Sequence, residues 1–421
     1  MHKVTRDMLG RQRLTRVDEA LAILLSHLGT AEPPTEIVPL TSALDRITAE
    51  PIISPEDLPA HARSTMDGYA VQAVDTFGAT ESMPGYLQIV GEVAMGDQPT
   101  LEIKRGDCAR IATGGLLPSG TDAVIMLEHT VPIDETMIEV VKAVGVGTNL
   151  IAPGEDIGKG SQALPAGHRL RPQDLGLLAG LGIDRVGVYR RLSVGVLSTG
   201  DEIVPYTDTP PPGKIRDING ITLSGLIERA GAQSILYGIV SDRKDRFFPA
   251  VEKAIHENDI VLFSGGSSVG VRDLGEQAIA SLGNPGILVH GVALKPGKPI
   301  IIGLTGTTPI FGLPGHPVSA MVCFEFFVEP TIRHLSGLRV RETLPRPVIT
   351  ARLGRNINSA PGRRDLIRVQ LSRKGTGWIA DPVLGKSGAI TTLSHAHGSF
   401  LIDEDSQGLT KDTEVKVTLY L

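Results

Sequence analysis

Three glycine-rich loops in the stretch from Asp259 to Ala320 decide the fold of this chain. The stretch reads Asp259-Ile-Val-Leu-Phe-Ser-Gly-Gly-Ser-Ser-Val-Gly-Val-Arg-Asp273, then Leu294-Lys-Pro-Gly-Lys-Pro-Ile300, then Phe311-Gly-Leu-Pro-Gly-His-Pro-Val-Ser-Ala320. Short apolar runs beside Gly/Ser loops are typical of strands in a parallel α/β sheet. Because ligands of such sheets bind beyond the carboxyl ends of the strands, we expect the three loops to meet at one site.

The residues of these loops suit an anionic ligand. Glycine lets the backbone come close to a ligand, and its free N–H groups can cradle an anion. Lys295 and Lys298 place two ammonium groups on a proline-stiffened turn. Pro317 predicts the first turn of a helix, whose N-terminus also attracts negative charge. Asp273 stands among these cationic features, so we expect a divalent metal beside a phosphate.

The composition restricts the class of protein. A chain of 421 residues is long enough for about three domains. Its formal net charge of −6 argues against nucleic acid or an anionic membrane as the main partner. The two cysteines, Cys108 and Cys323, lie far apart in the sequence and suggest no disulfide framework. Such cysteine usage fits a protein of the reducing cytoplasm. We expect no signal peptide, because no apolar run directly follows the basic residues near the N-terminus. We expect no membrane span, because no apolar run is long enough to cross a bilayer.

Several segments resemble the signatures of the MoeA family, the molybdopterin molybdenumtransferases related to the E domain of gephyrin. They are Ser264-Gly-Gly-Ser-Ser-Val-Gly270, Lys295-Pro-Gly-Lys-Pro299, Gly312-Leu-Pro-Gly-His-Pro-Val-Ser-Ala320, Met66-Asp-Gly-Tyr-Ala70 and Arg110-Ile-Ala-Thr-Gly-Gly-Leu-Leu-Pro118. The resemblance therefore runs over nearly the whole chain. This chain departs from the family pattern at two positions. The family usually has Asn where this chain has His316, and it commonly has Val where this chain has Ser267.

The sequence pattern changes along the chain and predicts a multidomain protein of the α/β plus β class. Short alternating runs predict a small β insertion, alternating strands and helices predict a doubly wound α/β domain, and period-two alternation near the end predicts a C-terminal β-barrel. The resemblance implies that the α/β domain is MogA-like. It also implies that the N-terminal helix packs with a later segment to form a discontinuous N-terminal domain. The expected divisions are 1–50 plus 151–190, 51–150, 191–337 and 338–421.

Four acids follow strands of the predicted α/β domain and form a candidate metal site. They are Asp201, Glu202, Asp242 and Asp273. Surface loops are often acidic, so one such residue alone would indicate only solvation. Four acids at the same end of one sheet favour a metal-assisted site, for which we expect Mg²⁺.

The resemblance also implies which residues act and which bind substrate. The candidates for catalysis are Asp67, Thr113, Asp156, Glu202, Asp242 and Asp273. The candidates for substrate binding are Gly265, Gly266, Ser268, Gly270, Lys295, Lys298, Pro314, Pro317, Ser319, Arg368 and Ser387. Sequence reasoning leaves open which of Arg363, Arg364 and Arg368 contacts the oxyanion.

The function that the resemblance implies is the Mg²⁺-dependent insertion of molybdate into adenylylated molybdopterin, with release of AMP and molybdenum cofactor. It further implies a cytoplasmic homodimer and leaves open a contact with the molybdopterin adenylyltransferase. Two alternatives remain on the same fold, a nucleotide pyrophosphatase and a scaffold without turnover. The Lys, Asp and Ser residues at the loop positions argue against the scaffold.

Overall fold

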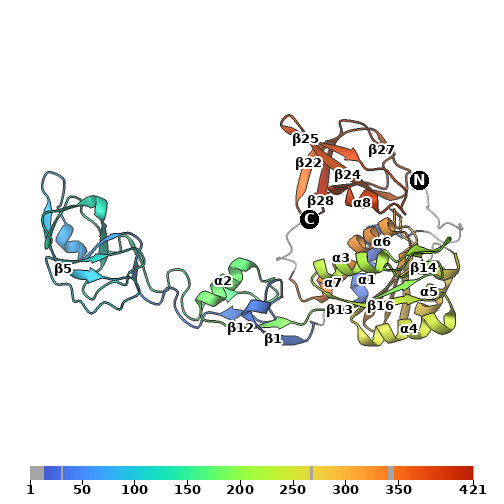
Figure 1. The fold of residues 1–421 in the computed structure, drawn as a ribbon, viewed down its shortest axis with the longest axis horizontal. Coiled ribbons are helices and arrows are strands. Elements are labelled where there is room, and N and C mark those ends of the chain that lie inside the picture. The colour runs from blue at the N-terminus through green and yellow to red at the C-terminus, as the bar shows by residue number, and fades with distance from the viewer. Residues whose placement is uncertain (1–13, 30–31, 266–268, 340–345, 421) are drawn as a thin grey trace.

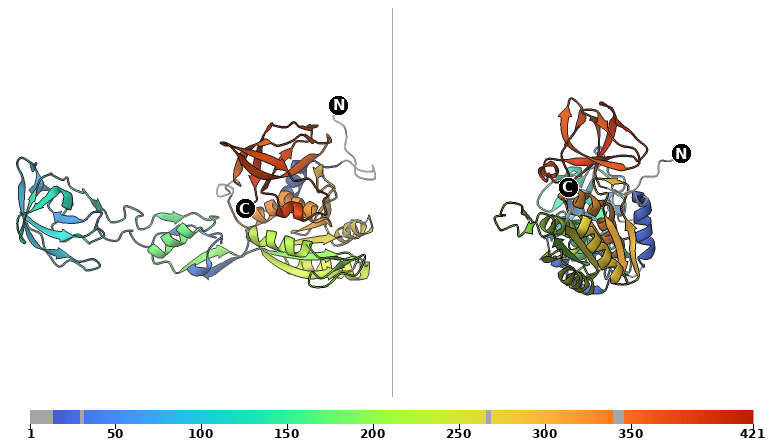
Figure 2. Two further views of the ribbon diagram at one scale, coloured as in Figure 1. Left: turned by 45° about the horizontal axis from the view of Figure 1, so that its top comes forward. Right: turned by 90° about the vertical axis from the view of Figure 1, so that its right-hand side faces the viewer.

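The molecule is elongated and has four parts, two of which lie side by side at one end (Figure 1). The computed structural model describes residues 14–29, 32–265, 269–339 and 346–420. An α/β body and a C-terminal barrel lie at one end, a small middle domain follows, and a β insertion lies at the far end (Figure 1, Figure 2). Within the described residues, no helix has the length and apolarity needed to cross a bilayer.

The α/β body is built on a six-stranded sheet with one strand reversed. In sheet order the strands are β16 (Gln233–Val240), β13 (Ser193–Thr199), β17 (Ile260–Gly265), β21 (Thr308–Pro314), β20 (Ile301–Thr305) and β18 (Pro285–His290). β20 runs antiparallel to both neighbours, so the expectation of a purely parallel sheet was wrong. The cause is the tight turn at Gly306, which has a φ of 59° and joins β20 directly to β21.

The reversal of β20 helps to build the site. Ile301, at the start of β20, pairs with Gly312 near the end of β21. The loop that precedes β20 therefore lies at the carboxyl edge of the parallel strands. This geometry brings Lys295 and Lys298 to the same edge as the glycine-rich loop after β17, as the sequence predicted.

Helices cover both faces of the sheet, which confirms the doubly wound architecture. On one side lie α3 (Asn219–Arg229) and α6 (Pro317–Cys323), which continues through η4 (Phe324–Val328) into α7 (Glu329–Leu335). On the other lie α4 (Lys244–Glu257) and α5 (Val269–Ser281). Alternate side chains of β17 pack into the two cores. Leu262 packs into the core beneath α3 and α6, and Phe263 packs into the core beneath α4 and α5.

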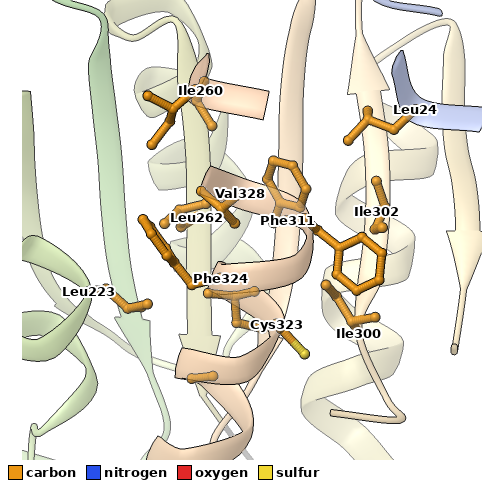
Figure 3. Packing of buried hydrophobic residues seen from close by; sticks show 14 of the residues in the cluster. Leu24, Leu223, Ile260, Leu262, Ile300, Ile302, Phe311, Cys323, Phe324 and Val328 are labelled. Carbon is orange, nitrogen blue, oxygen red and sulfur yellow. The ribbon is translucent and has the colours of Figure 1, made fainter. Parts of the chain in front are cut away.

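The N-terminal helix α1 (Val17–His27) packs on the α/β body. Leu24 is fully buried in the same core as Ile302 and Phe311 (Figure 3). The expectation that this helix packs with the segment 151–190 was therefore wrong. Its apolar stripe covers the β18 side of the sheet, which would otherwise be exposed.

The middle domain is formed without α1. β1 (Thr35–Pro39) pairs antiparallel with β12 (Arg185–Tyr189), and α2 (Pro172–Gly180) packs on them through a small core that contains Val38, Leu178 and Val186. Two thin two-stranded connections lead onward to the insertion. They are β2 (Ile52–Ile53) with β11 (Gln162–Leu164) and β3 (Arg63–Ser64) with β10 (Leu150–Ile151).

The insertion is built of β-strands, as predicted, and they form a six-stranded sheet with a small core on each face. In sheet order its strands are β7 (Ala123–Met126), β4 (Gly68–Val71), β6 (Asp107–Ile111), β5 (Gly85–Val93), β9 (Met137–Val140) and β8 (Thr130–Pro132). Residues of β4 alternate between the cores, since Tyr69 and Val71 face one and Ala70 faces the other.

The C-terminal part is a closed five-stranded barrel. Its strands are β24 (Arg364–Lys374), β25 (Gly377–Pro382), β22 (Val348–Leu353), β28 (Glu414–Leu419) and β26 (Gly398–Ile402), and pairing of β24 with β26 closes it. A short strand of the body, β19 (Leu294–Lys295), pairs with β24, so that Lys295 lies beside Asp365. This pairing fixes the barrel against the loops at the edge of the sheet.

Candidate active site

A cavity of about 330 Å³ lies between the α/β body and the barrel. Its wall contains Lys295, Lys298, His316 and Arg363. The other lining residues are Phe263, Gly265, Leu294, Pro296, Gly297, Pro299, Ile301, Gly312, Leu313, Pro314, Gly315, Ser319 and Ser387. No acid is among the described residues of this wall, so the cavity suits an anion.

The loop before β20 supplies both lysines. Lys295 donates to Asp365 Oδ2 at 2.8 Å, and the Asp365 side chain is only 1% exposed. The Lys295 side chain remains half exposed. Asp365 therefore holds the ammonium group of Lys295 at the rim of the cavity without closing it off from solvent.

Two further segments complete the cavity wall. Pro314, Pro317 and Ser319 lie where β21 passes into α6, which begins at Pro317 as predicted, and Ser319 is buried. From the barrel, the loop that carries Ser387 approaches this segment. The Ser387 carbonyl accepts a hydrogen bond from the Val318 N–H at 3.2 Å, which ties the two parts together.

The three candidate arginines have different surroundings. Arg363 lines the cavity. Arg364 makes a bidentate pair with Asp18 at 2.7 and 2.8 Å, and these hydrogen bonds raise its pKa. Arg368 is buried beside Thr392 and lines an adjoining cavity of about 300 Å³ that shares Lys295 and Ser387 with the first. The geometry therefore favours Arg363 over the predicted Arg368 for direct contact with an anion in the first cavity.

Gly265 ends β17 at a very close approach to β13. A Cβ atom built on Gly265 would stand 1.6 Å from the carbonyl oxygen of Thr199, its partner in the parallel ladder. This oxygen belongs to the backbone and cannot turn away, so only glycine fits here.

We expect Gly265→Ala to lower the thermal midpoint and to abolish anion binding, because β13 and β17 must separate at their carboxyl ends. Gly225→Ala is the matched control. Gly225 lies in α3 with no atom within 4 Å of an added Cβ, so alanine there should stabilise the helix by about 0.5–1 kcal/mol. Thermal unfolding and molybdate titration of both variants test this, and a Gly265→Ala protein that binds normally would contradict it.

Three of the four predicted acids, Asp201, Glu202 and Asp242, lie at the neighbouring loops of β13 and β16. Asp242 accepts hydrogen bonds from the Thr199 hydroxyl and, at 3.4 Å, from the Asp201 N–H. Asp201 Oδ1 accepts from the Ser241 hydroxyl at 3.1 Å. Glu202 lies on the same turn as Asp201 and folds back toward Gly200. Within the described part of the chain, no three His, Cys, Asp or Glu side chains are arranged to hold a metal by themselves.

Four predicted residues of the glycine-rich loop are only partly covered by the structure. Gly266 and Ser268 lie outside the described residues. Gly270 and Asp273 lie in the first turns of α5, of which the helical backbone is described but not the side chains. Helix α5 is the next described element after β17 and begins at Val269.

Sequence reasoning assigned no role in the site to Asn219 or Asp217. Asn219 is buried, and its amide donates to Ser264 Oγ at 2.7 Å and to the Gly315 carbonyl at 2.9 Å. It thereby joins the end of β17 to the loop before α6. Asp217 accepts from the Ser198 hydroxyl at 2.6 Å and from the Gly220 N–H at 2.9 Å. The signal in the sequence was a polar pair at a helix start, since Asn219 is the first residue of α3 and Asp217 lies two positions before it.

Asp67 and Thr113 are brought together, but far from the cavity. Asp67 Oδ1 accepts from the Thr113 N–H at 2.7 Å and from its hydroxyl at 3.0 Å, and these bonds lower the pKa of Asp67. Both belong to the insertion, at the opposite end of the molecule from the barrel (Figure 1). Asp156 is exposed in the adjoining connection. Within a single chain, therefore, Asp67, Thr113 and Asp156 lie away from the cavity.

Comparison with known proteins gives matches along the whole chain. The MoeA N-terminal region (domain I and II) matches residues 15–182, a probable molybdopterin binding domain matches 195–334, and the MoeA C-terminal region (domain IV) matches 350–420. The molybdopterin molybdenumtransferase of Nostoc is 38% identical over 73% of this chain and 71% of its own. That of Haemophilus influenzae is 36% identical over 84% and 85%.

A solved structure shares the fold. The crystal structure of the molybdopterin biosynthesis MoeA protein from Pyrococcus horikoshii is 33% identical and covers 97% of this chain and 100% of its own, with a TM-score of 0.83. The match includes the insertion, the α/β body and the barrel. The chain therefore belongs to the MoeA family of molybdopterin molybdenumtransferases.

Proposed function

We propose that this enzyme inserts molybdate into adenylylated molybdopterin and releases AMP and molybdenum cofactor. The observation that carries the proposal is the cavity between body and barrel, whose described wall has Lys295, Lys298 and Arg363 but no acid. Molybdate is a small dianion that must be held while dithiolene sulfurs replace its oxygens. Such a wall neutralises the charge of the dianion and positions it for this exchange.

Different groups around the cavity neutralise the charge of the dianion and donate hydrogen bonds to it. Lys298 and Arg363 neutralise charge, and Lys295 does so from the position that Asp365 gives it. Ser319 and Ser387 offer hydroxyl donors from opposite sides, one from the body and one from the barrel. No covalent intermediate is needed, because positioning and charge neutralisation lower the barrier to ligand exchange.

The phosphates of the substrate would bind at the glycine-rich loop that begins at Gly265, next to the acids of the sheet edge. Mg²⁺ usually binds one or two carboxylates together with substrate phosphates rather than an all-protein cage. The pair Asp201 and Asp242, with Glu202 on the same turn, fits this sparse mode of binding, and we propose Asp273 as a further ligand. Bound there, the ion would neutralise charge that develops on the phosphates as AMP leaves.

We further propose a homodimer in which a second copy completes the site. Asp67 and Thr113 lie at the far end of the chain from the cavity, so their part in the reaction requires the insertion of another copy. Mixing Lys298→Ala chains with Asp67→Asn chains tests this. Mixed dimers then contain one intact site and should regain part of the activity that each variant alone lacks. A mixture as inactive as its components would contradict the shared site.

We place the enzyme in the cytoplasm, because both cysteines are free and buried. Burial raises the pKa of Cys108 to about 12, so this thiol is unreactive at neutral pH.

The substrate must come from an enzyme that transfers an adenylyl group to molybdopterin. Direct contact with that enzyme would protect the substrate during transfer.

The test of the reaction is AMP release from adenylylated molybdopterin with Mg²⁺, with and without molybdate. We expect release that depends on molybdate in the wild type and falls strongly in Asp242→Asn and Asp273→Asn. Equal release without molybdate would instead indicate a nucleotide pyrophosphatase. No release with either molybdate or tungstate would indicate a scaffold.

A further inference from the structure

His316 links the body to the barrel at the edge of the oxyanion cavity. It stands between Gly315 and Pro317, directly before α6, and its Nδ1 lies 3.0 Å from Ser387 Oγ. Its side chain is exposed, and its Cδ2 approaches the barrel loop again at Gly388. Among the described residues of the cavity wall, His316 alone belongs to a residue type that ordinarily titrates near neutral pH.

The protonation state of His316 determines what Ser387 can offer to a ligand. When Nδ1 carries no proton, it accepts the Ser387 hydroxyl hydrogen, and the serine presents only lone pairs to the cavity. When Nδ1 carries a proton, it donates to Ser387 Oγ instead. The hydroxyl hydrogen is then free to point at a bound oxyanion.

We propose that His316 is a positioning residue that, in its protonated form, turns the Ser387 hydroxyl toward the bound oxyanion. This inference rests on the proposed function, since it takes molybdate as the ligand of the cavity. The imidazolium also adds positive charge at the junction between α6 and the barrel loop. Binding of the dianion is thereby linked to uptake of a proton.

The charges around His316 set the sign of this linkage. Lys295 and Lys298 face the cavity from the loop before β20, Arg363 faces it from the barrel, and Lys386 belongs to the same loop as Ser387. Asp365, an acid of the barrel strand β24, is engaged with Lys295. A bound dianion favours positive charge on the groups around it, so molybdate affinity should fall as pH rises.

Calorimetric titration of the full chain with molybdate alone tests the inference. Between about pH 6 and pH 8, wild-type affinity should fall roughly tenfold, which corresponds to about 1.4 kcal/mol. Binding should take up protons, seen as a heat that varies with the ionisation enthalpy of the buffer. His316→Asn keeps a polar group against Ser387 but cannot titrate, so its affinity should be nearly independent of pH.

Two further variants separate the inference from its alternatives. His395→Asn makes the same exchange at an exposed histidine of the barrel outside the cavity wall, and it should keep the wild-type slope. Ser387→Ala should lose affinity and show a shallower pH slope, because the hydroxyl that His316 orients is gone and only the charge of the imidazolium remains. A wild-type slope in His316→Asn or in Ser387→Ala overturns the inference while molybdate binding stands. No molybdate binding by the wild type would overturn the proposed function itself.

Discussion

Replacing Lys295 by methionine is expected to lower molybdate-dependent AMP release by about 10²-fold or more, in the range seen when one oxyanion-stabilising donor is removed. The physical reason is twofold. The cavity loses an ammonium group at its rim, and Asp365, which is 1% exposed, loses its cation. A buried carboxylate without a partner costs about 1–3 kcal/mol of unfolding free energy, so the melting temperature should fall as well.

A double variant separates the lost charge from the lost stability. Lys295→Met combined with Asp365→Asn leaves no buried charge unpaired, so its melting temperature should recover toward the wild type. Its AMP release should stay low, because the cavity still lacks the ammonium group. Steady-state kinetics and thermal melts on the same preparations measure both quantities. Recovery of activity together with stability would show that Lys295 acts only as the partner of Asp365.

Replacing Asp67 by asparagine is expected to lower AMP release by roughly 10²-fold, although the residue lies far from the cavity of its own chain. The bonds from Thr113 lower the pKa of Asp67, so this side chain is a carboxylate at neutral pH. In the proposed homodimer, the asparagine variant removes that charge from the site of the partnering copy. Because Asp67 is exposed, the melting temperature should not change.

Asp134 supplies a matched control in the same domain. It accepts hydrogen bonds from the Thr136 N–H at 2.7 Å and from the Thr136 hydroxyl at 2.8 Å, and these bonds lower its pKa in the same way. Asp134→Asn should leave AMP release unchanged. If both variants lose activity equally, the effect belongs to the folding of the insertion and not to a catalytic role of Asp67.

The sequence predicted the parts of the site that depend on local patterns. Apolar runs ending in Gly/Ser loops located the edge of the sheet, and Pro317 predicted the start of α6. The spacing of Lys295 and Lys298 placed both on one turn, which the structure puts in the cavity wall. These features succeed because strand ends, caps and proline turns are encoded by residues close together in the chain.

The sequence did not reveal features that depend on long-range packing. The apolar stripe of α1 showed that the helix is buried but not which core accepts it, and the core of the α/β body does so. Arg364 could be set aside as the oxyanion contact only because it pairs with Asp18, which lies more than 300 positions away in the chain. The role of Asn219 as a bridge required the positions of Ser264 and Gly315 in space.

The most direct test of the account is a single-turnover experiment with enzyme in excess over adenylylated molybdopterin and with Mg²⁺ present. AMP is measured by chromatography, and molybdenum-loaded cofactor is measured by activation of a cofactor-free molybdoenzyme. The account predicts that both products appear together, in equal amounts, only when molybdate is added, and that Lys295→Met slows both alike. AMP that appears at the same rate without molybdate would contradict it.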